Sequence, residues 1–135
     1  IVATGEEERA VNFDPTRPIY LQIMEEVKKR AVRGKYAPGE QLPSVREMAS
    51  RMGVNPNTMG RAYQELEREG FVHTRRGEGS FVTHEATRIE SERTTLAQAA
   101  CARFAEQLKD LGLDPSVTRN LLQQVEEEVS KDVDG

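Results

Sequence analysis

The sequence predicts a mainly α-helical protein with one small β-hairpin and a pair of helices toward its C-terminal end. Apolar residues recur every three or four positions over most of residues 19–70 and 96–129, as they do in helices that bury one face. Two short segments rich in strand-forming residues, 71–74 and 80–83, flank a stretch with two glycines, which is typical of a hairpin.

Length and composition exclude several classes of protein. The 135 residues can form one modest core with an appendage, or two small domains. No apolar run approaches the ~18–20 residues that a membrane span needs, and residues 1–14 lack the pattern of a signal peptide. A single cysteine, Cys101, excludes an internal disulfide, and His73 and His84 are too few for a metal site. We therefore expect a cytoplasmic protein with no membrane association, metal or cofactor.

The net charge of −4 is distributed unevenly along the chain. Residues 17–84 carry twelve basic and eight acidic groups, whereas residues 1–16 carry one basic and four acidic groups. Residues 85–135 carry six basic and eleven acidic groups. A basic middle between acidic ends is compatible with a nucleic-acid partner, although solvated faces of mixed charge would also explain it.

The first two predicted helices follow a mobile arm over residues 1–12 and a turn at residues 14–18. The first helix has a buried stripe and ends before Gly34; the stripe consists of Ile19, Ile23, Val27 and Ala31. Ser44 and Glu47 form an S-x-x-E capping box at the start of the second helix. The buried face of this helix consists of Val45, Met48, Ala49 and Met52.

The second helix stops and a third begins almost at once, at Gly53-Val54-Asn55-Pro56. Glycine can adopt the left-handed conformation that ends a helix, and a proline disfavours helical geometry at the residue before it. Asn55 suits the N-cap and Pro56 suits the first helical position. The third helix is expected to end near Gly70 and to bury Met59, Ala62, Tyr63 and Leu66. The sequence thus predicts two short helices at a defined angle, joined by a three-residue turn.

The predicted hairpin follows, with strands at residues 71–74 and 80–83. We expect Arg75 and Arg76 at its base and Gly77 and Gly79 at its tip. The order of helix, helix-turn-helix and hairpin is that of a winged helix-turn-helix domain, which we assign to residues 13–84.

The third helix has a polar outward face made of Asn57, Gly60, Arg61, Gln64 and Arg68. In a helix-turn-helix protein, such a face reaches base edges in the major groove, and Asn and Arg can make bidentate contacts there. Arg46, at the positive end of the preceding helix, suits a phosphate. The full set of candidate DNA-binding residues is Ser44, Arg46, Asn55, Pro56, Asn57, Thr58, Arg61, Tyr63, Gln64, Arg75, Arg76, Gly77 and Gly79.

Each of these features alone has a plainer explanation. Residues 55–58 could be helix capping, Arg61 and Gln64 could be solvated surface, and residues 77–79 could be a tight turn. Tyr63 is favoured as a core residue whose hydroxyl could also reach a phosphate. The combination in this order favours DNA binding over its separate explanations.

Residues 85–135 are predicted to form a helical tail. One helix carries an apolar stripe from Leu96 to Leu111, residues 112–115 end it, and a second helix carries a stripe from Val117 to Val129. Two amphipathic helices alone bury little area, so this pair needs a partner surface.

The sequence resembles the DNA-binding domain of GntR-type bacterial transcription regulators over about residues 13–83. The motifs that carry the resemblance are PIYLQI at 18–23, GKYAPGEQLPS at 34–44 and LPSVREMASRMGVNPNTMGRAYQELEREGFVHTRRGEGSFV at 42–82. The resemblance implies that Arg46, residues 56–58 and Gly79 lie at the DNA. The sequence departs from relatives at Gly60, where they often carry a longer polar side chain, and at Glu78 in the wing tip. Both departures bear on affinity and sequence preference.

The short tail resembles that of the YtrA-type branch, whose members dimerise through it. This resemblance implies a homodimer with candidate dimerisation residues Leu96, Ala100, Phe104, Leu108, Leu111, Leu121 and Val125. The larger effector-binding domains of other branches would not fit in residues 85–135.

The predicted function is that of a sequence-specific transcription regulator, a dimeric repressor of a palindromic double-stranded DNA operator. Two alternatives stay open: a winged helix used for protein–protein contact, and a ligand-responsive activator of the same family with an unknown small-molecule effector. An enzyme is not expected, because the sequence has no nucleophile–base pair, no clustered carboxylates with a basic partner and no phosphate loop.

Overall fold

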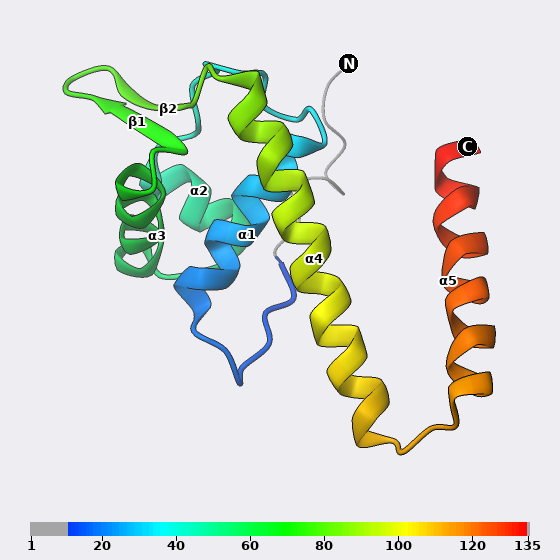
Figure 1. The fold of residues 1–135 in the computed structure, drawn as a ribbon. Helices are drawn as coiled ribbons and strands as arrows, with labels where there is room; N and C mark the ends of the chain where they lie inside the picture. Colours follow the sequence, from blue (N-terminus) through cyan, green and yellow to red (C-terminus); the bar gives the residue numbers. More distant parts are fainter. Residues whose placement is uncertain (1–10, 135) are drawn as a thin grey trace. The chain divides into compact units, whose positions relative to one another are not determined.

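The computed structural model describes residues 11–134, in which five helices and two strands follow one another (Figure 1). They are α1 (Ile19–Val32), α2 (Val45–Met52), α3 (Pro56–Arg68), β1 (Val72–Arg75), β2 (Gly79–Val82), α4 (Ala86–Asp110) and α5 (Pro115–Asp134). Most of the predicted mobile arm, residues 1–12, lies outside the described residues; Val11 is half-buried against the core. The chain divides into two compact units, one up to Leu96 and one from Ala97 onward.

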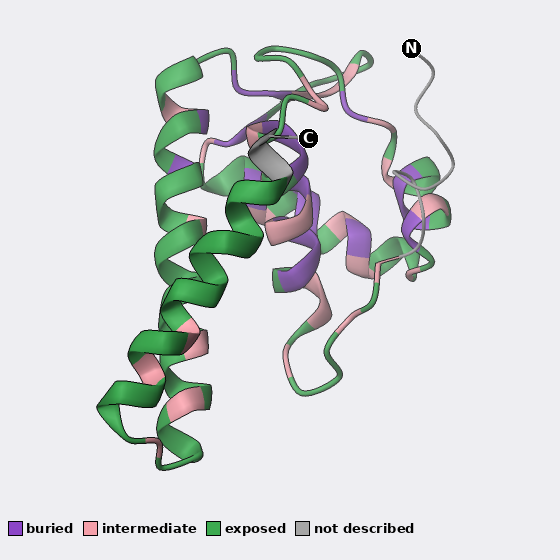
Figure 2. Ribbon diagram, turned by 90° about the vertical axis from the view of Figure 1, so that its right-hand side faces the viewer, coloured by how far each residue is buried: buried purple, intermediate pink, exposed green. Residues whose placement is uncertain are grey.

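The core of the first unit lies between α1, α2, α3 and the start of the hairpin (Figure 2). The apolar stripes predicted for the three helices are buried in it, with Ile19 and Val45 half-buried at the ends of their stripes. The side chains that are almost fully enclosed include Ile23, Val27, Met48, Met52, Met59, Leu66, Phe71, Val72 and Val82. The mainly helical fold class with a hairpin is therefore confirmed.

Local hydrogen bonds build the helix-turn-helix as the sequence predicts. The Ser44 hydroxyl accepts the backbone N–H of Glu47 at 3.1 Å and caps α2. Gly53 has φ +70° and ends α2, as a left-handed C-terminal glycine does. The Asn55 side-chain oxygen accepts the backbone N–H of Asn57 at 2.7 Å and caps α3. The turn between the helices has three residues, so α3 begins at a defined angle to α2.

The two strands pair in antiparallel register from Val72–Val82 to Arg75–Gly79. Each strand lies one residue nearer the turn than predicted, because the ladder continues to Arg75 and leaves only residues 76–78 in the turn. The sequence-based placement of Arg75 and Arg76 at the base of the hairpin is therefore wrong, and both lie at its tip. Residues 39–42 run along β2, and the backbone N–H of Leu42 donates to the carbonyl of Ser80 at 2.8 Å.

Helix α4 begins at Ala86, ten residues before the apolar stripe that predicted it. Its first part belongs to the first unit and contacts the ends of α1 and α3 mainly through polar groups. Arg88 donates to the carbonyl oxygen of Glu69 (2.8 Å), which follows the end of α3. Arg93 donates to the carbonyl oxygen of Val32, the last residue of α1. Apolar periodicity could not reveal this segment, because Ile89 is its only buried apolar residue.

The second unit contains the end of α4 and α5. Asp114 caps α5 by accepting the backbone N–H of Ser116 at 2.9 Å, and this hydrogen bond, followed by that of the Ser116 hydroxyl, lowers the pKa of the Asp114 carboxyl. None of the helices in residues 11–134 is both long and apolar enough to cross a membrane.

Candidate nucleic-acid interface

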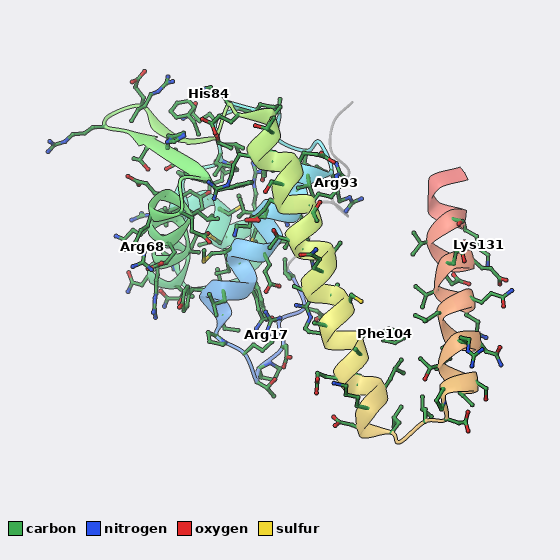
Figure 3. All side chains as sticks on the ribbon, viewed as in Figure 1. Arg17, Arg68, His84, Arg93, Phe104 and Lys131 are labelled. Atoms are coloured by element: carbon green, nitrogen blue, oxygen red, sulfur yellow. The ribbon has the colours of Figure 1, made fainter. Side chains whose placement is uncertain are left out.

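The outward face of α3 is polar and solvent-exposed, whereas its inward face is enclosed. Asn57, Arg61 and Gln64 are exposed, and the side chain of Arg68 is 78% exposed on the outer side of the helix (Figure 3). Every residue predicted to face inward is buried. This is the arrangement that a helix needs in order to enter a groove of DNA while it stays anchored to its own domain.

Arg46 lies in the first turn of α2, beside α3. It shares a shallow surface hollow with residues at the start and middle of α3: Pro56, Asn57, Gly60, Arg61 and Gln64. No hydrogen bond or ion pair engages the Arg46 guanidinium within residues 11–134. An arginine at a helix N-terminus, exposed and without an internal partner, is available to a phosphate oxygen.

Gly60 is half-buried at the point where α3 passes α2. A Cβ atom at this position would lie 3.9 Å from Val45 Cγ1, which is ordinary van der Waals contact. The close approach of the two helices therefore does not require glycine here.

Tyr63 belongs to the core, as favoured from the sequence. Its side chain is 5% exposed, and its hydroxyl donates to the carbonyl oxygen of Pro43 at 2.6 Å. Burial raises the pKa of the Tyr63 hydroxyl well above its ordinary value. Tyr63 thus ties α3 to the residue that precedes Ser44, and so fixes where α2 begins relative to α3.

The tip of the hairpin lies on the same side of the first unit as α3 (Figure 1). Arg75 stacks over the Phe81 ring, with 4.7 Å between its Cζ and the ring centroid, and Arg76 and Gly77 are exposed. Gly79 has φ +124°, and a Cβ atom there would lie 2.5 Å from Gln41 Nε2. The left-handed backbone conformation at position 79 therefore favours glycine, whereas the close contact is with the flexible end of the Gln41 side chain, which can shift.

Two residues at this surface were missed by the sequence analysis. Gln41 donates from its side-chain amide to the carbonyl oxygen of Glu78 at 2.7 Å and braces the tip. Tyr20, in the first turn of α1, lies under Arg61, whose Cζ is 3.8 Å from the centre of the tyrosine ring. Each pair joins residues about 40 positions apart in the sequence, so no local pattern could reveal it.

The histidines, the cysteine and the acidic side chains of the described residues do not cluster into a second site. In the part of the chain that the structure describes, no three His, Cys, Asp or Glu side chains are placed to hold a metal ion. The rings of His73 and His84 lie 6.2 Å apart at the surface, and Cys101 is exposed.

The residues predicted for dimerisation lie on partly open surface of α4, of α5 and, for Leu111, of the turn between them. Leu96, Phe104, Leu108 and Leu121 are half-buried, whereas Ala100, Leu111 and Val125 are exposed. Leu111 is 69% exposed, and Val117, Leu122 and Val129 are also open to solvent. An apolar hollow in the second unit is lined by residues that include Phe104, Leu108, Leu113 and Leu122.

Comparison with known proteins identifies the relatives of the chain. The family described as "Bacterial regulatory proteins, gntR family" matches residues 19–82. The uncharacterised HTH-type transcriptional regulator YhcF of Bacillus subtilis is 46% identical over 101 residues, covering 75% of this chain and 84% of the relative. The HTH-type transcriptional repressor YtrA of Bacillus subtilis is 39% identical over 130 residues, covering 93% of this chain and 95% of the relative.

Solved structures agree. A GntR family transcriptional regulator from Listeria monocytogenes superposes with a TM-score of 0.71 at 35% identity, covering 83% of this chain and 98% of that one. The DNA-binding domain of AraR in complex with operator ORX1 superposes with a TM-score of 0.51 at 26% identity, covering 56% of this chain and 95% of that domain. The helix-turn-helix, the hairpin and the short helical tail therefore belong to a regulator rather than an enzyme, and the chain is a member of the gntR family of bacterial regulatory proteins, in its YtrA-like branch.

Proposed function

We propose that this regulator represses transcription by binding, as a homodimer, to a double-stranded DNA operator with two-fold symmetry. The observation that carries the proposal is the exposed polar face of α3, with Asn57, Arg61 and Gln64 beside the unpartnered guanidinium of Arg46 in the described structure. Asn and Arg side chains supply the bidentate donors and acceptors that distinguish base pairs in the major groove.

Each part of the interface has a proposed role. Residues 56–64 enter the major groove, and Ser44 and Arg46 bind the phosphate backbone beside it. The wing contacts a second stretch of the DNA backbone, or enters the minor groove, through Arg75, Arg76, Gly77 and Gly79. Tyr63 acts indirectly, because its buried hydroxyl is committed to Pro43 and holds α2 in register with α3. The AraR domain bound to its operator supports this use of the fold.

Repression is supported by YtrA of Bacillus subtilis, a repressor with which the chain shares nearly its whole length. Dimerisation is supported by the apolar surface of the second unit, which includes Leu111 and Val125. A two-fold dimer implies half-sites centred about 34–36 Å apart, or a multiple of that spacing.

Selection of bound DNA from a random double-stranded pool tests the proposal, with the affinity then measured against salt concentration. We expect a palindromic site that is bound at least about a thousandfold more tightly than random DNA at physiological salt. Weak binding that is equal for all sequences and lost in moderate salt would reject a sequence-reading regulator in favour of electrostatic attraction alone. That result would favour the use of the winged helix for protein–protein contact.

A further inference from the structure

Tyr20 is the second residue of α1 and is far from the recognition helix in sequence, yet it lies against it in the fold. Its ring is half-buried, packs on the core and supports the guanidinium of Arg61, with 3.8 Å between Cζ and the ring centroid. This distance is well inside the ~6 Å within which a cation and an aromatic face attract each other.

The stack controls which part of Arg61 remains available. A guanidinium is planar and carries five N–H donors around its edge, so contact with one face leaves these donors free. No acidic side chain pairs with Arg61 in the described part of the chain. Arg68, about two turns farther along α3, is instead paired with Glu65. Tyr20 therefore holds Arg61 without occupying the donors that would recognise a base.

The start of α1 also borders the start of α3. An open groove between them is lined by Pro18, Ile19 and Tyr20 on one side and by Asn57, Thr58 and Arg61 on the other. The start of α1 thus borders the end of α3 that is proposed to read bases, and Tyr20 is the residue of α1 that contacts Arg61.

We infer that Tyr20 is a specificity-determining positioning residue, which presents the edge of the Arg61 guanidinium to a guanine in the operator. This inference rests on the proposed DNA-binding function and assigns one of its contacts. Guanine is the expected base because its O6 and N7 acceptors match two donors of an arginine. A long side chain that is ordered before binding loses less conformational entropy on reaching its base, so the stack favours the matched operator over other sequences.

The experiment compares Tyr20→Leu, which removes the ring, with Tyr20→Phe, which keeps the ring and removes only the hydroxyl. Each variant is made in the wild-type chain and in an Arg61→Ala background. Dissociation constants are measured for the selected operator, for random DNA, and for operators changed at the base pair whose preference disappears in Arg61→Ala. Thermal unfolding of each variant without DNA shows whether the fold is intact.

We expect Tyr20→Leu to weaken operator binding by roughly two- to fivefold, the effect of an exposed cation–π contact, and to leave random DNA binding unchanged. Tyr20→Phe should bind like the wild type. In the Arg61→Ala background, Tyr20→Leu should cause no further loss, because the tyrosine acts through the arginine. If Tyr20→Leu unfolds the chain, Tyr20→Met takes its place, since methionine fills irregular core space without a ring.

Three results would overturn the inference while the proposed function stood. They are an unchanged operator affinity in Tyr20→Leu, an equal loss in Tyr20→Phe, and a loss that persists in the Arg61→Ala background. A wild-type chain that selects no operator would overturn both the inference and the proposed function, so the two failures are distinguishable.

Discussion

Gly60→Ala should stabilise the protein, although the substitution lies in the proposed DNA-reading helix. Gly60 is inside α3, and its φ is not positive. The added Cβ would meet Val45 Cγ1 at 3.9 Å, which is ordinary contact rather than a clash. A glycine in a helix interior is less favourable than alanine by about 0.8–1.0 kcal/mol. We therefore expect the free energy of unfolding to rise by about 1 kcal/mol.

Gly53→Ala is the matched control, because it makes the same chemical change seven residues earlier with the opposite expected sign. Gly53 has φ +70° at the C-terminal cap of α2. An L-residue in this left-handed conformation is disfavoured by roughly 1–2 kcal/mol. The pair separates backbone conformation from the mere addition of a methyl group.

Urea unfolding followed by circular dichroism measures both variants at one protein concentration, because the stability of the proposed dimer would depend on concentration. An increase of about 1 kcal/mol for Gly60→Ala should also raise Tm by about 4 °C. A Gly60→Ala variant that is less stable than the wild type would refute the reasoning, since it would mean that α2 and α3 pack too closely for any side chain. A stable Gly53→Ala variant would refute the capping argument.

Three further predictions concern DNA binding, acid stability and the extent of the DNA-binding unit. Arg46→Ala should weaken binding to operator and random DNA alike, and should lower the slope of log affinity against log salt concentration by about one unit. Arg119→Ala in α5 is the control and should change neither. Affinity measured at several salt concentrations checks both variants. The folded-state pKa of the Asp114 carboxyl lies below its ordinary value of 3.8. The stabilisation of the fold by this ionised cap is therefore present above pH 3.8, and it is lost as the pH falls through the folded-state pKa. Asp114→Asn should keep the cap and remove this part of the acid dependence of helicity. A chain that ends at Leu96 should be a folded monomer by light scattering. A chain that ends at Glu85 should unfold at a lower urea concentration than the chain that ends at Leu96. If either shortened chain were a dimer, the proposed role of the tail would be contradicted.

Much of the DNA-binding unit could be predicted from the sequence because its determinants are local. Ser44, Gly53 and Asn55 act within three or four residues of their own positions, as caps and as a left-handed turn. The buried stripes of α1, α2 and α3 follow from helical periodicity alone. Local rules therefore predicted both the elements and which face of α3 is exposed.

The parts that could not be predicted depend on contacts between distant segments. The stack of Arg61 on Tyr20 and the bond from Gln41 to Glu78 require the tertiary fold, and neither residue pair has a sequence signature. The bounds of both strands were misjudged by one residue, because the ladder continues to the pair Arg75–Gly79 and leaves only residues 76–78 in the turn. The sequence also could not show that the Tyr63 hydroxyl is buried and donates to the carbonyl oxygen of Pro43 rather than lying at the surface.

Helix α4 shows why a change in the composition of a sequence, here from basic to acidic after residue 84, need not mark the end of a structural unit. Lys28 of α1 pairs with Glu92 of α4 at 2.6 Å and with Glu69 at 3.1 Å, and the side chains of Lys28 and Glu92 are both nearly enclosed. The carbonyl of Glu69 is in turn bonded to Arg88. Ion pairs with little exposure are screened less by salt than surface pairs, and loss of one partner leaves the other charge poorly solvated. The start of α4 is therefore held by the ends of α1 and α3, so a helix that looks like the beginning of a separate tail contributes to the unit that carries the recognition helix.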